Sequence, residues 1–332
     1  MHYCTYMRVL AGDVGGTNAR LAMVDVGQGT ARIEQERVYP SADADSLHTI
    51  MRQFLRDSDA PMPERACIAI AGPVVDGHVQ VTNLPWVVDR DALREKLGVE
   101  RLDVINDFMA IGHGLDLLGA DDLVTLQAGE PVPHGPVAYL GPGTGLGVGF
   151  RLWSGDRYRV YASEGGHVDF APRDQVQAGL TEFLRAAHGR ASNERVLSGG
   201  GLADVYRYLA QASPKKVQQF VDAEMKREDP AAVVTRHALA GDDVLCGQAV
   251  ALFVSVLGAV AGNLALIAVA TGGVYVTGGI APRIVPMLRE PGFLQAFHDQ
   301  GRLSTLVARA PVHVVTNTKV GLLGAAGYAA RP

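Results

Sequence analysis

The distribution of apolar residues along the chain predicts two similar sets of strands, each of which opens with a glycine-rich hairpin. The segment Arg8–Val24 (RVLAGDVGGTNARLAMV) consists of two short apolar runs with glycines between them. The same arrangement returns at Val137–Leu152 (VAYLGPGTGLGVGFRL). Short apolar runs that flank a turn are typical of paired strands. The recurrence indicates an internal repeat of two α/β lobes.

Over the rest of the chain, apolar positions at helical spacing alternate with further short apolar runs. Strands are predicted at residues 65–71, 79–82, 102–105, 273–277 and 312–316. Helices are predicted at residues 43–56, 89–97, 108–118, 176–188, 201–211, 230–240 and 321–330. This alternation places the chain in the α/β class. We expect a small domain at residues 1–118, a larger and more helical domain at 119–311, and a return of residues 312–332 to the small domain.

The longest apolar segment, Ala249–Ala270, contains no charged residue and is therefore a candidate for a membrane span. Ser255, Gly258 and Asn263 interrupt it, and no Lys, Arg, Trp or Tyr anchor lies close to either end. We interpret the segment as a buried core helix of a soluble protein with no membrane partner.

Composition excludes several classes of protein. The 332 residues are 48% hydrophobic and 20% charged, which suffices for a large core. A net charge of −5 and the lack of a basic tract argue against a nucleic-acid partner. Cys4, Cys67 and Cys246 are far apart, so neither a disulfide framework nor a Cys-pair metal site is expected. Together with an N-terminus that does not resemble a signal peptide, this predicts a cytoplasmic location.

The first hairpin tip has the composition of a phosphate-binding loop: Gly12, Asp13, Val14, Gly15, Gly16, Thr17 and Asn18. Glycines let backbone N–H groups approach an oxyanion closely. Thr17 and Asn18 add hydrogen-bonding side chains. Asp13 would repel phosphate directly, so we expect it to orient Mg²⁺, either directly or through water. The competing interpretation is a structural hairpin without a ligand.

Two further glycine clusters extend this interpretation to a whole nucleotide. The second hairpin tip, Gly141–Gly147 (GPGTGLG), departs from a dinucleotide-binding fingerprint because Leu146 replaces its last glycine and a strand follows. The chain also lacks the Gly-Lys-Ser/Thr of a Walker loop. Three glycine clusters in this order predict a different nucleotide site. Its predicted contacts in the second half of the chain are Gly143, Thr144, Gly145, Gly278 and Gly279.

Polar residues at two other places are candidates for chemistry. Asn106 and Asp107 end a predicted strand, where α/β proteins place ligand-binding groups. The alternative role for Asp107 is the N-cap of the next helix. Glu164, His167 and Glu194 offer carboxylates and an imidazole suited to several neighbouring hydroxyls. A single histidine is more often structural than catalytic.

Taken together, five segments resemble the bacterial ATP-dependent glucokinases, part of the sugar kinase, Hsp70 and actin superfamily. They are Gly12–Asn18, Ile105–Phe108, Gly141–Gly147, Glu164–Phe170 and Glu194–Gly199. The resemblance extends over nearly the whole chain. It implies two RNase H-like (actin-like ATPase) lobes with a cleft between them, of which the second is larger and more helical.

The resemblance also implies residue roles. Asp107 is similar to the family's general base, which acts on the sugar 6-hydroxyl, and Asn106, Glu164, His167 and Glu194 resemble the glucose-binding set. The two hairpins resemble phosphate clamps, and Gly278 and Gly279 part of the adenosine site. A related branch carries a Cys-rich zinc loop after an equivalent histidine, but here no cysteine follows His167 until Cys246, so zinc is not expected. Family members usually form homodimers.

The implied reaction is ATP + D-glucose → ADP + glucose 6-phosphate, with Mg²⁺. Three alternatives stay open at this point: a kinase for another hexose such as mannose, fructose or an N-acetylated sugar, a non-catalytic sugar sensor on the same fold, and an actin-like or acetate-kinase-like ATPase. A sensor that regulates transcription would require a DNA-binding region, and only Met1–Met7 precede the first motif. The ATPase would not require Glu164, His167 and Glu194.

Overall fold

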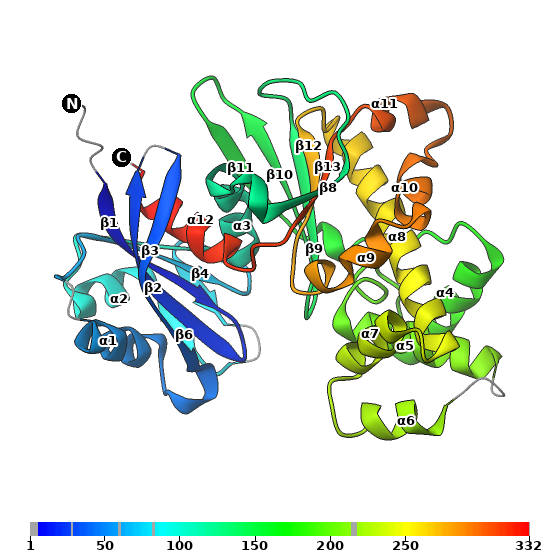
Figure 1. Ribbon diagram of the computed structural model, residues 1–332. Coiled ribbons are helices and arrows are strands. Elements are labelled where there is room, and N and C mark those ends of the chain that lie inside the picture. Colours follow the sequence, from blue (N-terminus) through cyan, green and yellow to red (C-terminus); the bar gives the residue numbers. More distant parts are fainter. Residues whose placement is uncertain (1–5, 28, 59–60, 82–83, 214–217, 332) are drawn as a thin grey trace. The chain divides into compact units, whose positions relative to one another are not determined.

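The computed structural model describes residues 6–27, 29–58, 61–81, 84–213 and 218–331, and the chain divides into two compact units (Figure 1). Unit 1 comprises residues 1–122 and 317–332, and unit 2 comprises residues 123–316. The predicted boundaries lay at 118 and 311. The second boundary differs because β13 (Val312–Val315) pairs with β12 (Gly273–Val276) in the sheet of unit 2, so that only the segment after β13 belongs to unit 1.

Unit 1 is built on a mixed sheet of five strands in the order β3-β2-β1-β4-β7. Neighbours are antiparallel among β1, β2 and β3, whereas β4 is parallel to both β1 and β7. The strands are β1 Met7–Val14, β2 Asn18–Gly27, β3 Thr30–Pro40, β4 Arg65–Ile70 and β7 Arg101–Asn106. A separate two-stranded ribbon joins β5 (His78–Gln80) to β6 (Val87–Asp89).

Unit 2 repeats this plan in the strand order β11-β10-β9-β12-β13, with β8 added antiparallel to β13. Again three antiparallel strands are followed by two parallel ones. The strands are β8 Leu123–Gln127, β9 Val137–Pro142, β10 Leu146–Trp153, β11 Tyr158–Ser163, β12 Gly273–Val276 and β13 Val312–Val315. The shared order confirms the duplication predicted from the two glycine-rich hairpins.

The third strand of each set, β3 and β11, was missing from the predicted elements. β3 reads TARIEQERVYP and contains no buried residue. An outer strand needs no continuous apolar face, and charges on it discourage pairing with other chains. Its sequence therefore lacks the apolar run that reveals β1 or β4.

Four helices cover the two faces of the unit 1 sheet: α1 Leu47–Asp57, α2 Arg90–Leu97, α3 Asp107–Gly114 and α12 Val320–Ala329. Alternating strand residues supply both faces, so Leu10 packs with Phe54 of α1, whereas Val9 packs with Leu322 of α12. α12 also lies tightly against α3. A Cβ at Gly324 would lie 1.8 Å from the carbonyl oxygen of Ala110, so this contact requires glycine.

Unit 2 carries a long helical insertion between β11 and β12. Its helices are α4 Gln175–His188, α5 Gly199–Ala212, α6 Gln219–Met225, α7 Pro230–Ala240 and α8 Val244–Ala268. Three shorter ones follow β12: α9 Val285–Leu288, α10 Pro291–His298 and α11 Ser304–Ala308. Asp229 caps α7 and Gly241 ends it in a left-handed conformation, as the sequence predicts.

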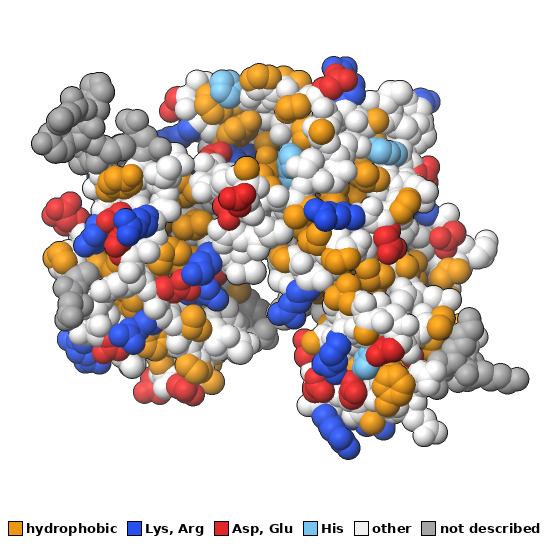
Figure 2. All heavy atoms as spheres, in the orientation of Figure 1, with side chains coloured by type: hydrophobic (Ala, Val, Ile, Leu, Met, Phe, Trp, Pro, Cys, Tyr) orange, Lys and Arg blue, Asp and Glu red, His pale blue; other side chains and the backbone are white. Residues whose placement is uncertain are grey.

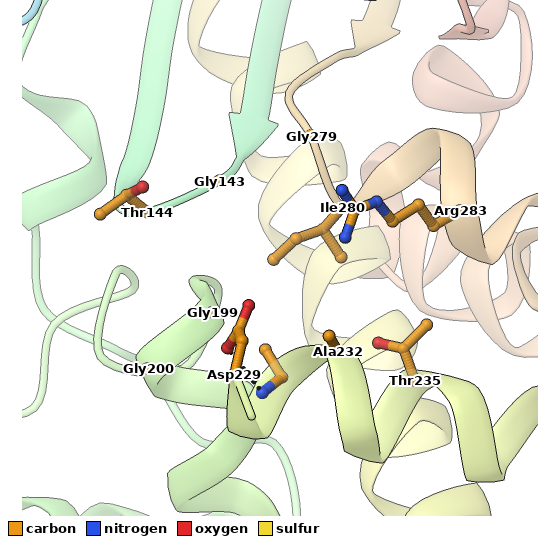
Figure 3. Close-up of a pocket in the computed structure, with 11 residues that line it drawn as sticks. Gly143, Thr144, Gly199, Gly200, Asp229, Ala232, Thr235, Gly279, Ile280 and Arg283 are labelled. Carbon is orange, nitrogen blue, oxygen red and sulfur yellow. Dashed lines mark hydrogen bonds between the residues drawn. The ribbon is translucent and has the colours of Figure 1, made fainter. Parts of the chain in front are cut away.

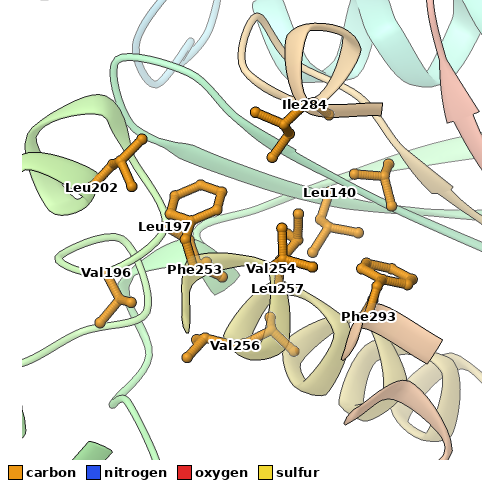
Figure 4. Close-up of a cluster of buried hydrophobic side chains, with 14 of the residues drawn as sticks. Leu140, Val196, Leu197, Leu202, Phe253, Val254, Val256, Leu257, Ile284 and Phe293 are labelled. Atoms are coloured by element: carbon orange, nitrogen blue, oxygen red, sulfur yellow. The ribbon is translucent and has the colours of Figure 1, made fainter. Parts of the chain in front are cut away.

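The uncharged segment forms the core helix α8, which contacts α5, α7, α10 and β9. Phe253 and Leu257 lie inside the cluster that Phe293 and Leu140 complete (Figure 4). By length and composition α8 is the one membrane-span candidate within the described ranges, with a mean hydropathy of 2.3, yet 67% of its apolar window is buried. This packing is that of the predicted core helix.

The surface carries charges of both signs. On the face that Figure 2 shows, Lys and Arg side chains are interspersed with Asp and Glu side chains, and no basic stripe gathers there. The prediction that the protein has no nucleic-acid partner rests on this kind of charge distribution and stays a prediction.

Candidate active site

In unit 1, three parallel strands end at one edge of the sheet. The register pairs Val14 at the end of β1 with Ile70 of β4, and Ile70 with Asn106 of β7. The hairpin turn follows Val14, and Asp107 follows Asn106. Because neighbouring strands lie about 4.8 Å apart, the turn and Asp107 share this carboxyl edge. Such edges are where α/β sheets bind ligands.

The hairpin turn itself is tightly fastened. The Gly15 N–H donates to the Asn18 carbonyl at 2.9 Å. Ser41, which is fully buried, donates from its N–H to the Thr17 carbonyl at 2.9 Å and from its Oγ to the Gly15 carbonyl at 2.9 Å. Thr17 and Asn18 are exposed. Sequence reasoning missed Ser41, since a serine beyond a strand gives no signal of the turn that it holds.

The turn is shorter than predicted, because Gly12, Asp13 and Val14 belong to β1 rather than to the loop. A Cβ at Gly12 would lie 2.7 Å from Ile68 Cδ1, and the Val14 side chain is buried in the core. Packing inside the sheet therefore explains Gly12 and Val14. The part of this motif at the turn is Gly15–Asn18.

Asp13 is half-buried on β1, and its carboxylate makes no hydrogen bond to a described residue. Burial raises the pKa of Asp13, whereas its cross-strand neighbour Arg20 acts to lower it. A Cβ at Gly321, in the first turn of α12, would lie 3.3 Å from Asp13 Oδ2. A carboxylate oxygen without a protein partner is the kind of donor that Mg²⁺ accepts. No group of three or more metal-ligating side chains occurs among the described residues.

Asn106, and not Asp107, caps α3. Its Oδ1 accepts from the N–H groups of Phe108 at 2.9 Å and Met109 at 3.2 Å, and its Nδ2 donates to the Gly72 carbonyl at 3.1 Å. Asp107 is the first residue of the helix, half-buried, with Oδ1 2.9 Å from the Phe108 N–H. The alternative role considered for Asp107, the N-cap of α3, is thus filled mainly by Asn106.

In unit 2, two loops far apart in sequence bring Glu164, His167 and Glu194 together. The Glu194 N–H donates to the Gly166 carbonyl at 2.9 Å, which fastens one loop to the other. His167 Nε2 lies 3.9 Å from Glu164 Oε2, and His167 Nδ1 lies 3.8 Å from Glu194 Oε1. Both distances are too long for direct hydrogen bonds. The three side chains converge without saturating one another.

Glu194 also reaches the second hairpin. Its Oε2 accepts from the Leu146 N–H at 2.9 Å, and a Cβ at Gly145 would lie 2.5 Å from that oxygen. Gly166 is equally constrained, because a Cβ there would lie 1.9 Å from the Leu146 carbonyl oxygen. The glycines at these positions let the acidic loop and the hairpin pack together.

A cavity of about 370 Å³ opens beside this hairpin (Figure 3). It is lined by Gly143, Thr144, Gly199, Gly200, Asp229, Ala231, Ala232, Thr235, Gly279, Ile280 and Arg283. Of the five nucleotide contacts predicted in this half of the chain, Gly143, Thr144 and Gly279 line the cavity. Gly145 packs on Glu194 instead. Gly278 has a φ of 82°, and a Cβ there would lie 2.4 Å from the Pro142 carbonyl.

The remaining lining residues come from elements that the glycine motifs do not reveal. Gly199 and Gly200 begin α5, and the Gly199 N–H donates to the Gly143 carbonyl at 2.9 Å. Asp229 is the N-cap of α7, Thr235 lies on α7, and Arg283 comes from the turn after β12. The Asp229-Pro230 pair was recognised only as a helix start. A cap residue that also faces a cavity gives no additional sequence signal.

Comparisons with known proteins agree on one family. A family model described as Glucokinase matches residues 10–332. A glucokinase of Nostoc punctiforme is 43% identical, with 97% of this chain and 99% of the relative covered. The crystal structure of a glucokinase from an Antarctic psychrotroph matches with a TM-score of 0.86 and 33% identity, over 98% of this chain and 99% of that one. A glucokinase from Balamuthia mandrillaris in complex with glucose shares the fold, with a TM-score of 0.80 and 22% identity, over 100% and 96%.

Proposed function

The chain belongs to the glucokinase family and transfers a phosphoryl group from ATP to glucose, and on that premise we propose a role for each candidate residue. Unit 1 contributes the base and one proposed sugar contact, Asn106, and unit 2 contributes the other groups that hold the sugar ring. This assignment of roles to the two units is supported mainly by the contacts of Glu194. Within unit 2, Glu194 lies 3.8 Å from His167 and accepts a hydrogen bond from Leu146 in the glycine hairpin. The base candidate Asp107 stands on unit 1.

Asp107 is the proposed general base. Its carboxylate accepts the proton of the sugar 6-hydroxyl as the oxygen of that hydroxyl forms a bond to the γ-phosphorus of ATP. The bond between that phosphorus and the bridging oxygen breaks, and ADP leaves with the electron pair. Support comes from Asn106, which carries the cap of α3 and keeps the start of the helix in place.

Glu164, His167 and Glu194 are the proposed sugar ligands in unit 2. Their gaps of 3.8 and 3.9 Å suit hydroxyl groups that bridge carboxylate and imidazole, since a hydroxyl both donates and accepts. Asn106 completes the proposed set, although its amide oxygen already accepts two hydrogen bonds from α3. Any contact of Asn106 with sugar would therefore use the second hydrogen of its Nδ2.

The nucleotide is proposed to bind the cavity beside the second hairpin. Backbone N–H groups of Thr144 and Gly200 are suited to phosphate oxygens, whereas the Gly143 N–H donates to the Gly145 carbonyl at 2.8 Å and shapes the loop. In unit 1, Gly15, Gly16, Thr17 and Asn18 form the second proposed phosphate clamp. Asp13 would hold Mg²⁺, which when bound neutralises phosphate charge. Zinc is not expected.

A turnover assay with a panel of hexoses tests this proposal. We expect ATP-dependent phosphorylation of glucose, faster than that of mannose, fructose or N-acetylglucosamine, and loss of activity without Mg²⁺. Faster turnover of another hexose would reassign the sugar. ATP hydrolysis that no sugar stimulates would favour an ATPase, and sugar binding without turnover would favour a sensor.

We further propose that the protein acts in the cytoplasm as a homodimer. The burial of α8 inside unit 2 supports a protein that needs no membrane. Fractionation of native protein and light scattering of the purified chain test the two statements. Recovery only with detergent, or a monomeric mass at assay concentration, would contradict them.

A further inference from the structure

The two ends of the nucleotide cavity differ in chemistry (Figure 3). Gly143, Thr144, Gly199 and Gly200 lie on one side and present mainly backbone. Backbone N–H groups at the start of a helix such as α5 suit anionic oxygens. Ile280 and Arg283 lie toward the other side, opposite α7. An aliphatic side chain and a guanidinium suit the flat face of a purine.

Asp229 lies between these two ends (Figure 3). Its Oδ1 accepts from the Ala231 N–H at 3.0 Å and so caps α7, while its Oδ2 makes no hydrogen bond to a described residue. A carboxylate this close to a triphosphate is unfavourable unless hydrogen-bond donors lie between them. The part of a nucleotide between phosphate and base is the ribose, whose hydroxyls are such donors.

Thr235 gives an independent indication of a polar ligand. Thr235 lies on the same face of α7 as Ala231 and Ala232, and the residue is only 8% exposed. Its hydroxyl makes no hydrogen bond to a described residue. The hydroxyl oxygen itself is not sealed inside the protein and is accessible from the cavity that the residue lines. A ligand in the cavity would supply the missing partner.

We propose that Asp229 binds the 2′- and 3′-hydroxyls of the ribose and thereby makes the enzyme prefer ribonucleoside over deoxyribonucleoside triphosphates. This inference rests on the proposed assignment of the cavity to ATP. Thr235 then faces the base and not the phosphates. In this proposal, α7 and its cap contact the ribose and the base, while the glycine loops bind the phosphates.

The test compares the KM values of ATP, 2′-deoxyATP and 3′-deoxyATP for the unaltered protein, Asp229→Asn and Asp229→Ser. Asn and Ser both cap helices, so α7 keeps its first turn. Asn removes the charge, and Ser removes the whole carboxylate. For the unaltered protein we expect the KM of each deoxynucleotide to exceed that of ATP by about tenfold, the usual loss for a hydrogen bond to a charged group. In both variants the KM of ATP should rise toward the deoxynucleotide values.

Two control variants distinguish failure of the ribose contact from failure of the proposed ATP site in the cavity. Asp174→Asn changes another capping aspartate of unit 2, which accepts from the Gln177 N–H at 2.8 Å and lies outside the cavity lining, and should keep the preference. Ala232→Trp should fill the cavity and raise all three KM values. If it raises none of them, ATP does not bind in the cavity and both proposals fail.

Other outcomes overturn the ribose contact alone. One is an unaltered protein that does not distinguish ATP from deoxyATP while Ala232→Trp weakens both. Another is an equal effect of Asp229→Asn on all three nucleotides with a changed Mg²⁺ requirement, which would assign Asp229 to the metal. If Asp229→Asn fails to fold, as judged by glucose calorimetry, Asp229→Ser carries the comparison.

Discussion

Unit 1 and unit 2 share one strand order, but the groups at the carboxyl ends of their strands differ. In unit 1, the candidate base Asp107 follows β7 directly. In unit 2, the start of α5 and the first turns of α7, both from the insertion between β11 and β12, line a cavity beside the second hairpin. The duplicated sheet therefore supplies a glycine hairpin, the proposed phosphate clamp, in each unit, whereas the helices around it differ between the units.

The two hairpins are also fastened differently. In unit 1, the buried Ser41 holds the turn through the carbonyls of Gly15 and Thr17. In unit 2, the Gly199 N–H holds the Gly143 carbonyl, and Glu194 holds the Leu146 N–H. Among the described contacts, a candidate sugar ligand fastens the second hairpin and not the first. Occupation of the sugar site in unit 2 is expected to affect that hairpin directly.

The largest expected effect concerns Asp107. Asp107→Asn keeps the size of the side chain but cannot accept the proton, so kcat should fall by about 10²–10⁴. Because Asn106 carries the cap of α3, the melting temperature should change little. Asp89→Asn, at the cap of α2 in the same unit, is the matched control and should turn over normally. If a folded Asp107→Asn protein has a near-normal kcat, Asp107 is not the general base.

The next effect concerns the sugar ligands of unit 2. Glu194→Gln can still accept from the Leu146 N–H, but it loses the charge, so the glucose KM should rise about tenfold. 2-Deoxyglucose should be a weaker substrate than glucose. Glu182→Gln, on the exposed side of α4, is the control and should change neither value. An unchanged glucose KM in a Glu164→Ala, Glu194→Ala double variant would show that the sugar binds elsewhere.

A smaller effect separates the two neighbours on β7. Asn106→Ala removes the cap of α3, so the free energy of unfolding should fall by about 1 kcal/mol. Asn106→Asp keeps an accepting oxygen and should lose less. Urea unfolding of both variants measures the difference. If the alanine variant is as stable as the unaltered protein, Asp107 and not Asn106 is the residue that caps α3.

The smallest effect is a pH dependence in the helical insertion of unit 2. His237 Nε2 lies 2.8 Å from Glu224 Oε2, and Nδ1 lies 2.8 Å from Asp242 Oδ1. The pKa of His237 is raised, mainly by the hydrogen bond to Glu224 and also by the hydrogen bond to Asp242. The charged imidazole therefore stabilises the fold fully below its ordinary pKa of about 6.5, and this stabilisation is lost as pH rises through the higher pKa of the folded protein.

His237→Gln should consequently lower the melting temperature most at acidic pH. Its difference from the unaltered protein should shrink as pH rises. A difference that grows with pH would mean that the neutral imidazole is the stabilising form.

The sequence predicted the sheets better where strands are central. β1, β4, β9 and β12 contain uninterrupted apolar runs because they are covered on both faces. The outer strand β3 and the short helix α6 were missing because exposed elements lack such runs.

The same contrast applies to the candidate site. Glycine clusters pointed to both hairpins, since close backbone approach leaves a visible mark in composition. Ser41, Asp229 and Thr235 were missed as site residues, because their positions depend on which elements fold against the hairpins. Gly12 shows that a glycine can also reflect packing, since a Cβ there would lie 2.7 Å from Ile68 Cδ1, and its predicted contact with ATP stays a prediction.

The division of labour between the units is tested most directly by calorimetric titration of glucose into Asp107→Asn and Glu194→Gln side by side. We expect Asp107→Asn to bind glucose with a Kd close to that of the unaltered protein, and Glu194→Gln to bind it about tenfold more weakly. Weak binding to Asp107→Asn together with unchanged binding to Glu194→Gln would contradict this expectation, because the sugar would then be held by unit 1.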